Sequence, residues 1–147
     1  MLQPFALRVV VLGRYPPGLH FDEAVYGLLA RDILDGARPV FFSASTGREP
    51  LYMYLCAALF AAIGPTALAI RLTSAFAGTA TVALTFALGR ALFSRRAGLV
   101  AAGLVAVHYW HLTVSRNAYP NILIPPIEAA AAPRVSARGT SPASHSR

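Results

Sequence analysis

The sequence predicts an all-helical integral membrane protein with two to three transmembrane helices and two juxtamembrane helices. Only 13% of its 147 residues are charged and 56% are hydrophobic, whereas soluble proteins carry about 25% charged residues. The segment Leu72–Gly89 contains no charge and lies between Arg71 and Arg90. Its roughly 18 residues form about 27 Å of helix, close to the hydrocarbon thickness of a bilayer. We therefore expect a transmembrane helix over 67–92.

The N-terminal segment 1–14 is typical of the last turns of a transmembrane helix whose beginning is absent. It contains about 12 mostly apolar residues interrupted by Arg8, whereas a spanning helix needs about 20. A segment lying in the membrane interface is the alternative. Pro16, Pro17 and Gly18 then end any helix.

The region 15–66 is expected to be an outer loop that carries both juxtamembrane helices. Apolar residues recur at helical spacing from Phe21 to Ile33, which predicts a helix over 22–35. A second apolar run follows Pro50, a residue suited to the first turn of a helix, and predicts a helix over 50–63. About 14 residues rise only about 21 Å, too little to cross about 30 Å of hydrocarbon. Both helices should therefore lie in the membrane interface.

The apolar pattern resumes after the first full span. We expect a second transmembrane helix over 97–114, which contains an aromatic cluster around Tyr109 and Trp110 of the kind found at membrane interfaces. The remaining expected segments are a polar outer loop, the start of a further helix and a tail: 115–121, 122–132 and 133–147. The tail is rich in Ser, Arg and Pro and lacks periodicity, so it is either disordered or the product of a frameshift. We favour the frameshift, because an apolar helix stops abruptly where the composition changes.

The distribution of charge predicts the topology. Arg90, Arg95 and Arg96 lie between two expected spans and should face the cytoplasm. The regions 15–66 and 115–121 then both lie on the outer face. Five of the six acidic residues belong to the first of these regions. A functional site is therefore expected outside the membrane, on one side of the protein.

Two adjacent carboxylates, Asp22 and Glu23, follow the Pro-Pro-Gly turn and precede a helix. Such charges are costly inside a bilayer, so they should face water and be free for chemistry. Asp22 could instead cap the helix N-terminus. The scattered arginines form no basic stripe, which excludes nucleic acid as a partner. His20, His108 and His111 are not spaced to bind a metal together with carboxylates and are expected to be interface histidines.

Several stretches together resemble a known family: PPGLHFDEAVYGLLARDIL, GREPLYMYL, RLTSAFAGT, LGRALFSRRAGLVAA and YWHLTVSRNAYPNILIP. They are similar to bacterial glycosyltransferase family 39, integral membrane enzymes with the GT-C fold. Protein O-mannosyltransferases and lipid A aminoarabinose transferases are of this kind. The resemblance runs from about Val9 to Ala132 and corresponds to the N-terminal quarter to third of such enzymes.

The resemblance implies a reaction and a set of site residues. Family members transfer a hexose or pentose from a polyprenyl-phosphate donor to an acceptor on the non-cytoplasmic face, here of the bacterial inner membrane. Asp22 matches the general base that deprotonates the acceptor, and Glu23 would support it by hydrogen bonding. Arg48 and Arg116 match positions that could bind the donor phosphate. The other residues expected to line the substrate pocket are His20, Tyr26, Glu49 and Asn117.

The resemblance also has limits. In oligosaccharyltransferases the second outer loop continues into acidic, metal-binding residues, whereas here 117–121 contains no acid. No divalent metal or other cofactor is therefore expected. With later helices absent, the chain is expected to be an inactive fragment whose partners are the bilayer and a lipid-linked sugar. The alternative is a small non-catalytic membrane protein that binds a lipid or protein partner through its outer loop.

Overall fold

The computed structural model describes residues 2–10, 12, 17–43 and 48–139, and it is helical throughout that part apart from turns and connecting segments. The described residues form helices and no named strand, which agrees with the all-helical prediction. The elements in chain order are α1 (Leu2–Val9), α2 (Phe21–Leu34), α3 (Leu51–Ile63), α4 (Ala67–Leu92), α5 (Arg95–Val107), α6 (Tyr109–Arg116), the 3₁₀ helix η1 (Pro120–Leu123) and α7 (Ile124–Gly139).

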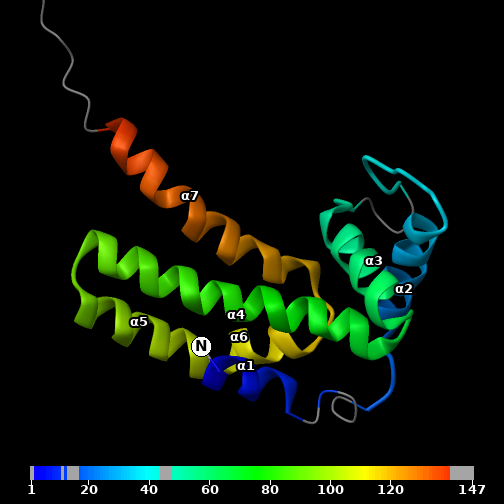
Figure 1. The fold of residues 1–147 in the computed structure, drawn as a ribbon, viewed down its shortest axis with the longest axis horizontal. Helices are drawn as coiled ribbons and strands as arrows, with labels where there is room; N and C mark the ends of the chain where they lie inside the picture. The colour runs from blue at the N-terminus through cyan, green and yellow to red at the C-terminus, as the bar shows by residue number, and fades with distance from the viewer. Residues whose placement is uncertain (1, 11, 13–16, 44–47, 140–147) are drawn as a thin grey trace, which may run out of the picture.

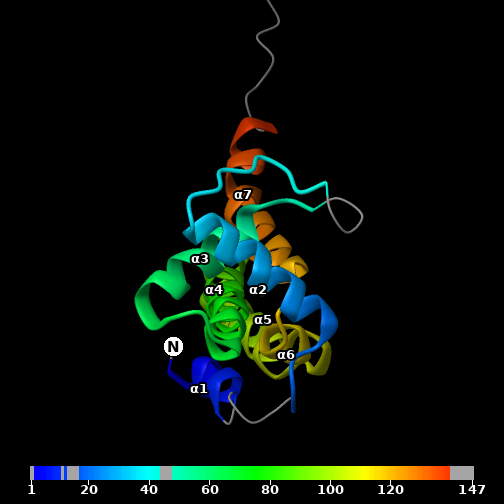
Figure 2. The ribbon, with the colours of Figure 1, turned by 90° about the vertical axis from the view of Figure 1, so that its right-hand side faces the viewer.

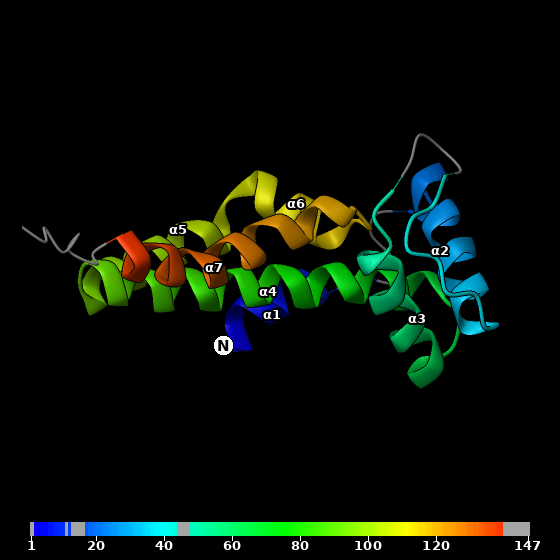
Figure 3. The same cartoon turned by 90° about the horizontal axis from the view of Figure 1, so that it is seen from above.

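Helix α4 is the axis of the molecule, and it contacts each of the other helices. Helices α1, α5, α6 and α7 lie along its length, whereas α2 and α3 stand across its N-terminal end (Figures 1 and 3). The view along α4 shows it surrounded by the other elements (Figure 2). Thr66 caps its N-terminus by accepting a hydrogen bond from the Ala69 amide at 3.2 Å. The fold thus consists of a long helix, α4, with four helices along its length and two helices, α2 and α3, across its N-terminal end.

Glycines allow the closest approaches to α4. A Cβ atom at Gly89 would lie 2.8 Å from Gly98 Cα of α5, and one at Gly78 would lie 2.5 Å from Ser115 Cβ of α6. Small residues are common where membrane helices pack closely, because they let two backbones approach. Gly89 and Gly78 therefore allow α5 and α6 to pack closely against α4.

Helix α4 is long and apolar enough to cross a membrane by itself. The segment 97–114, expected as one transmembrane helix, is instead divided between α5 and α6, which are bent by 59° at His108. The break leaves the side chain of His108 accepting from the His111 amide at the start of α6. The described residues thus contain one clear candidate span, or two if the bent pair counts as one. The third expected span stays a prediction.

The C-terminal part differs from expectation. Helix α7 begins at Ile124 and continues to Gly139, so the backbone at 133–139 is helical where a disordered or frameshifted tail was expected. The prediction of a disordered or frameshifted tail over 133–147 stays a prediction. Residues 140–147 lie outside the described part, as do residues 1, 11, 13 and 14 of the expected first helix, of which α1 forms Leu2–Val9.

The main core lies where α2 and α3 pack on the end of α4. It contains Tyr26, Ile33, Tyr52, Phe60 and Ile70, all of which are buried. The apolar residues that recur along α2 do not all pack into this core. Phe21 and Leu28 are 76% and 64% exposed. Helix α2 therefore has a buried face against α3 and α4 and a second, outward apolar face.

Candidate active site

The site is built on the first turn of α2. Gly18 adopts a positive φ of 77° in the turn before the helix, a conformation that favours glycine. His20 is the N-cap of α2, and Asp22 and Glu23 occupy its first turn. Asp22 is therefore not the N-cap, contrary to the alternative considered from the sequence. Glu23 Oε2 accepts a hydrogen bond from the His20 amide at 3.2 Å, as a third-position Glu does in a capping box.

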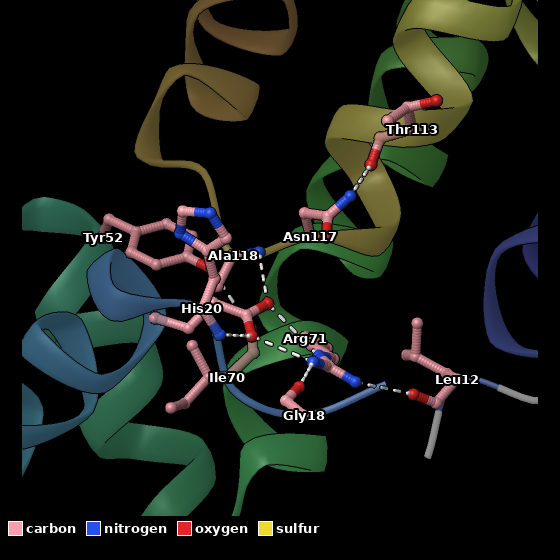
Figure 4. Close-up of polar contacts among 10 residues, drawn as sticks. Leu12, Gly18, His20, Tyr52, Ile70, Arg71, Thr113, Asn117 and Ala118 are labelled. Atoms are coloured by element: carbon pink, nitrogen blue, oxygen red, sulfur yellow. Dashed lines mark hydrogen bonds and ion pairs between the residues drawn. The ribbon is translucent and has the colours of Figure 1, made fainter. Parts of the chain in front are cut away.

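Glu23 points into the protein, where it forms an ion pair with Arg71 of α4. The Glu23 side chain and the Arg71 side chain are each 4% exposed, and Arg71 Nη2 lies 2.9 Å from Glu23 Oε2. Arg71 Nε donates to Glu23 Oε1 at 3.2 Å, and the Ala118 amide donates to the same oxygen at 3.2 Å (Figure 4). Arg71 also donates to the carbonyls of Leu12 and Gly18. The pair therefore joins the N-terminal segment, the turn, α2, α4 and the connection between α6 and η1.

The environment of Glu23 keeps its carboxylate ionised. Burial by itself would raise the pKa of Glu23, but hydrogen bonds from Arg71, His20 and Ala118, together with the charge of Arg71, lower it below the ordinary value of 4.5. Removing one partner of such a pair leaves a buried charge uncompensated. Glu23 thus supports the position of the first turn of α2, and its carboxylate is directed to Arg71 instead of to Asp22.

Asp22 points the other way, toward Arg48. Asp22 Oδ1 lies 3.6 Å from Arg48 Nη2, and the two side chains are 35% and 25% exposed. The backbone of Arg48 is fixed by an antiparallel bridge to Phe42, with hydrogen bonds of 3.0 and 3.2 Å. The structure therefore brings together a carboxylate and a guanidinium that are separated in sequence by much of the predicted outer loop, at a place that solvent reaches.

Tyr26 completes this group. Its hydroxyl accepts a hydrogen bond from Arg48 Nη1, and the Arg48 guanidinium lies 4.8 Å from the centre of the Tyr26 ring. Burial raises the pKa of the Tyr26 phenol, although the charge of Arg48 lowers it. The ring packs edge-on against Tyr52 at 5.9 Å, and the Tyr52 hydroxyl is itself 2.8 Å from Ser74 Oγ. Tyr26 is thus held as a neutral phenol whose own proton is available to an acceptor.

Arg116 and Asn117, two other predicted site residues, make hydrogen bonds outside this group. Arg116 donates to the Leu7 carbonyl of α1 at 2.9 Å, so the structure directs it toward α1. The side-chain amide of Asn117 (Nδ2) donates to the Thr113 carbonyl at 2.9 Å, at the C-terminal end of α6 (Figure 4). Glu49 and His20 have exposed side chains.

Arg71 is the residue that sequence reasoning missed. It was read only as the charge that precedes a transmembrane segment, yet it binds Glu23 across 48 positions of sequence. A signal was present, because an ionisable residue inside an otherwise apolar membrane helix is usually functional or paired. Its partner could not be identified from the sequence, since the pairing depends on how α2 packs against α4.

Comparison with known proteins gives a match for the part of the chain that begins at Arg48. A family model described as dolichyl-phosphate-mannose-protein mannosyltransferase matches residues 48–132. No curated protein matches the chain, and no solved structure does. The matched range begins at Arg48, includes Arg71 and Ala118, and ends within α7; Asp22 and Glu23 precede it. Because the match covers more than half of the sequence, the chain belongs to the dolichyl-phosphate-mannose-protein mannosyltransferase family, a family of membrane glycosyltransferases.

Proposed function

We propose that the chain forms the acceptor-activating and donor-binding end of a membrane glycosyltransferase. This enzyme moves a sugar from a polyprenyl-phosphate donor to an acceptor on the outer face of a bacterial inner membrane. The observation that carries the proposal is that two adjacent carboxylates have different surroundings. Glu23 is buried and bound to Arg71, whereas Asp22 is half-exposed beside Arg48.

Asp22 is the proposed general base. A base must be ionised at working pH and within hydrogen-bond reach of the proton that it removes. Asp22 lies beside Arg48, and its partial exposure leaves room for an acceptor hydroxyl. Their separation of 3.6 Å is long for a charge-assisted hydrogen bond, so the contact can be exchanged at little cost.

Arg48 is the proposed partner of the donor phosphate. A guanidinium binds a phosphate through two parallel N–H donors, and Arg48 directs its donors toward Tyr26 and Asp22. When Arg48 turns to the phosphate, Asp22 is released to accept the acceptor's proton. The chemistry then needs no divalent metal, because the guanidinium stabilises the charge that develops on the leaving phosphate.

The arrangement of apolar surface supports a site at the membrane boundary. Phe21 and Leu28 on α2, together with Val40 and Phe41 of the following segment, are largely exposed. Such a surface suits contact with the acyl chains or headgroups. A lipid-linked donor lying in the outer leaflet would thus bring its phosphate to the level of Arg48. Arg116 is not needed for this contact and stays a second phosphate candidate.

The test is sugar transfer by the full-length enzyme of which, as the sequence predicts, this chain is the N-terminal part. Asp22→Asn should lower kcat by about 10²-fold or more, because the amide cannot accept a proton. Asp32→Asn is the matched control, since Asp32 is exposed on the same helix, and it should leave kcat unchanged. Near-normal turnover by Asp22→Asn would rule out the base assignment. If removal of Asp22 and Glu23 together had no enzymatic consequence, the non-catalytic binding protein would be the better description.

A further inference from the structure

Helix α1 contains a buried cation, Arg8, which has no acidic partner among the described residues. Its side chain is fully buried. Nη1 donates to the Pro4 carbonyl at 2.7 Å, and Nη2 lies 2.9 Å from His111 Nδ1 of α6. Because arginine can only donate, His111 Nδ1 is the acceptor. Burying a charge beside neutral partners costs free energy, so packing alone does not explain an arginine at this place.

A second contact joins the same two helices in the opposite direction. Arg116, at the end of α6, donates from Nη1 to the Leu7 carbonyl of α1 at 2.9 Å. Gly78 of α4 leaves room for the Arg8 side chain, since a Cβ atom at Gly78 would lie 3.0 Å from Arg8 Nε. A side chain of α1 thus binds α6 while a side chain of α6 binds the backbone of α1. Together the two contacts fix the position of α6 relative to α1.

Both helices lead within a few residues to the buried Glu23–Arg71 pair. Beyond α1, the Leu12 carbonyl accepts from Arg71 Nη1 at 3.3 Å. Beyond α6, the Ala118 amide donates to Glu23 Oε1 at 3.2 Å (Figure 4). The chain and these hydrogen bonds therefore close a contact ring, whose members are Arg8, Leu12, Arg71, Glu23, Ala118 and His111.

We propose that Arg8 and His111 are positioning residues for the reaction, because their hydrogen bond closes the contact ring that holds the first turn of α2. Asp22 is the neighbour of Glu23 in that turn, so the ring determines where the Asp22 carboxylate lies. The inference rests on the proposed function, since it assigns the two residues to the step in which Asp22 removes the acceptor's proton. Neither residue touches the reacting atoms.

The main test replaces both partners by apolar side chains, as Arg8→Met together with His111→Phe in the full-length enzyme. Removing both members of a buried polar contact is nearly neutral or stabilising, so the unfolding midpoint should stay equal or rise. The kcat for sugar transfer should fall about ten- to 100-fold, because a slightly misplaced base loses most of its effect. The KM for the lipid donor should change by about twofold or less, since Arg48 lies outside the contact ring.

Single variants of His111 test the hydrogen bond itself. His111→Asn keeps a side-chain oxygen that can accept from Arg8 and should retain most of the native kcat. His111→Leu cannot accept and should lose kcat as the double variant does. Tyr109→Phe is the matched control on α6, because Tyr109 is 80% exposed, and it should leave kcat and the midpoint unchanged.

A purely structural role gives a different pattern. It predicts that the double variant unfolds at a lower temperature, or does not fold, and that molecules which remain folded turn over at the native rate. Either result would overturn the inference, as would equal kcat values for His111→Asn and His111→Leu.

Asp22→Asn, measured in parallel, separates this inference from the proposed function. If Asp22→Asn is active, the base assignment fails and the positioning role fails with it. If Asp22→Asn is inactive while the double variant keeps its native kcat, only the positioning role is wrong. An inactive Asp22→Asn beside a stable double variant with lowered kcat supports both.

Discussion

Asp22 and Glu23 show how adjacent residues of one type acquire different roles. Successive positions on a helix are about 100° apart, so one side chain can enter the core while the next faces solvent. Glu23 enters the core and meets Arg71, whereas Asp22 stays at the surface beside Arg48. Burial and partner thus separate Glu23, a structural carboxylate, from Asp22, the proposed base.

Loss of the buried partner should destabilise the protein strongly. Glu23→Gln leaves the Arg71 guanidinium buried without a counter-charge, so we expect the free energy of unfolding to fall by about 3–5 kcal/mol. Asp22→Asn breaks only a half-exposed ion pair and should cost about 1 kcal/mol or less. Thermal or denaturant unfolding in detergent micelles measures both. Equal losses for the two variants would mean that Glu23 is not the structural member.

The same ion pair should make stability depend on pH. The folded-state pKa of Glu23 is lowered below the ordinary value of 4.5, so its contribution is present above that pH. The contribution is lost as the pH falls through the lower, folded-state value. We therefore expect the unfolding midpoint of the native chain to drop in acid below about pH 4.5. Glu23→Gln should remove part of that drop, and an identical acid profile in this variant would contradict the assignment.

The packing of α6 on α4 depends on one glycine. A Cβ atom at Gly78 would lie 2.5 Å from Ser115 Cβ and 3.0 Å from Arg8 Nε. Gly78→Ala should therefore push α6 and α1 away from α4 and destabilise the protein by about 1–3 kcal/mol.

Gly103→Ala, in α5, is the matched control for this substitution. No atom lies within 4 Å of a Cβ placed at Gly103, so only the gain in helix propensity remains, and stability should stay equal or rise by up to about 1 kcal/mol. Unfolding midpoints of the two variants in the same micelles provide the comparison. A neutral Gly78→Ala would show that α6 is not packed against α4 as closely as described.

Local pattern and long-range packing differ in what the sequence reveals. The periodicity before Ile33 and the apolar run after Pro50 predict helices where α2 and α3 form, because both signals are local. The bend at His108 was not predicted, since no proline or glycine marks it. The sequence did not reveal which face of α2 packs on the protein. Phe21 and Leu28 are exposed, whereas Ile33 and the Glu23 carboxylate are buried.

At the scale of the whole molecule, the sequence likewise revealed the locally encoded part of the candidate site and not the part that depends on packing. The carboxylates and Arg48 were identified from motif and resemblance, and the fold brings Asp22 and Arg48 together. Arg71 and the connection at Ala118 were not identified, because each reaches Glu23 only through the packing of α2 across the end of α4. The buried Glu23–Arg71 pair thus connects α4 to the first turn of α2, where the candidate site lies.

The most direct measurement is turnover per folded molecule for Asp22→Asn and Glu23→Gln, side by side in the full-length enzyme. We predict that Asp22→Asn folds with a near-native unfolding midpoint and loses transfer by about 10²-fold or more. Glu23→Gln should lose stability first, and the molecules that remain folded should keep more activity than Asp22→Asn. The reverse pattern, with an active Asp22→Asn and a stable but inactive Glu23→Gln, would contradict the division of roles between the two carboxylates.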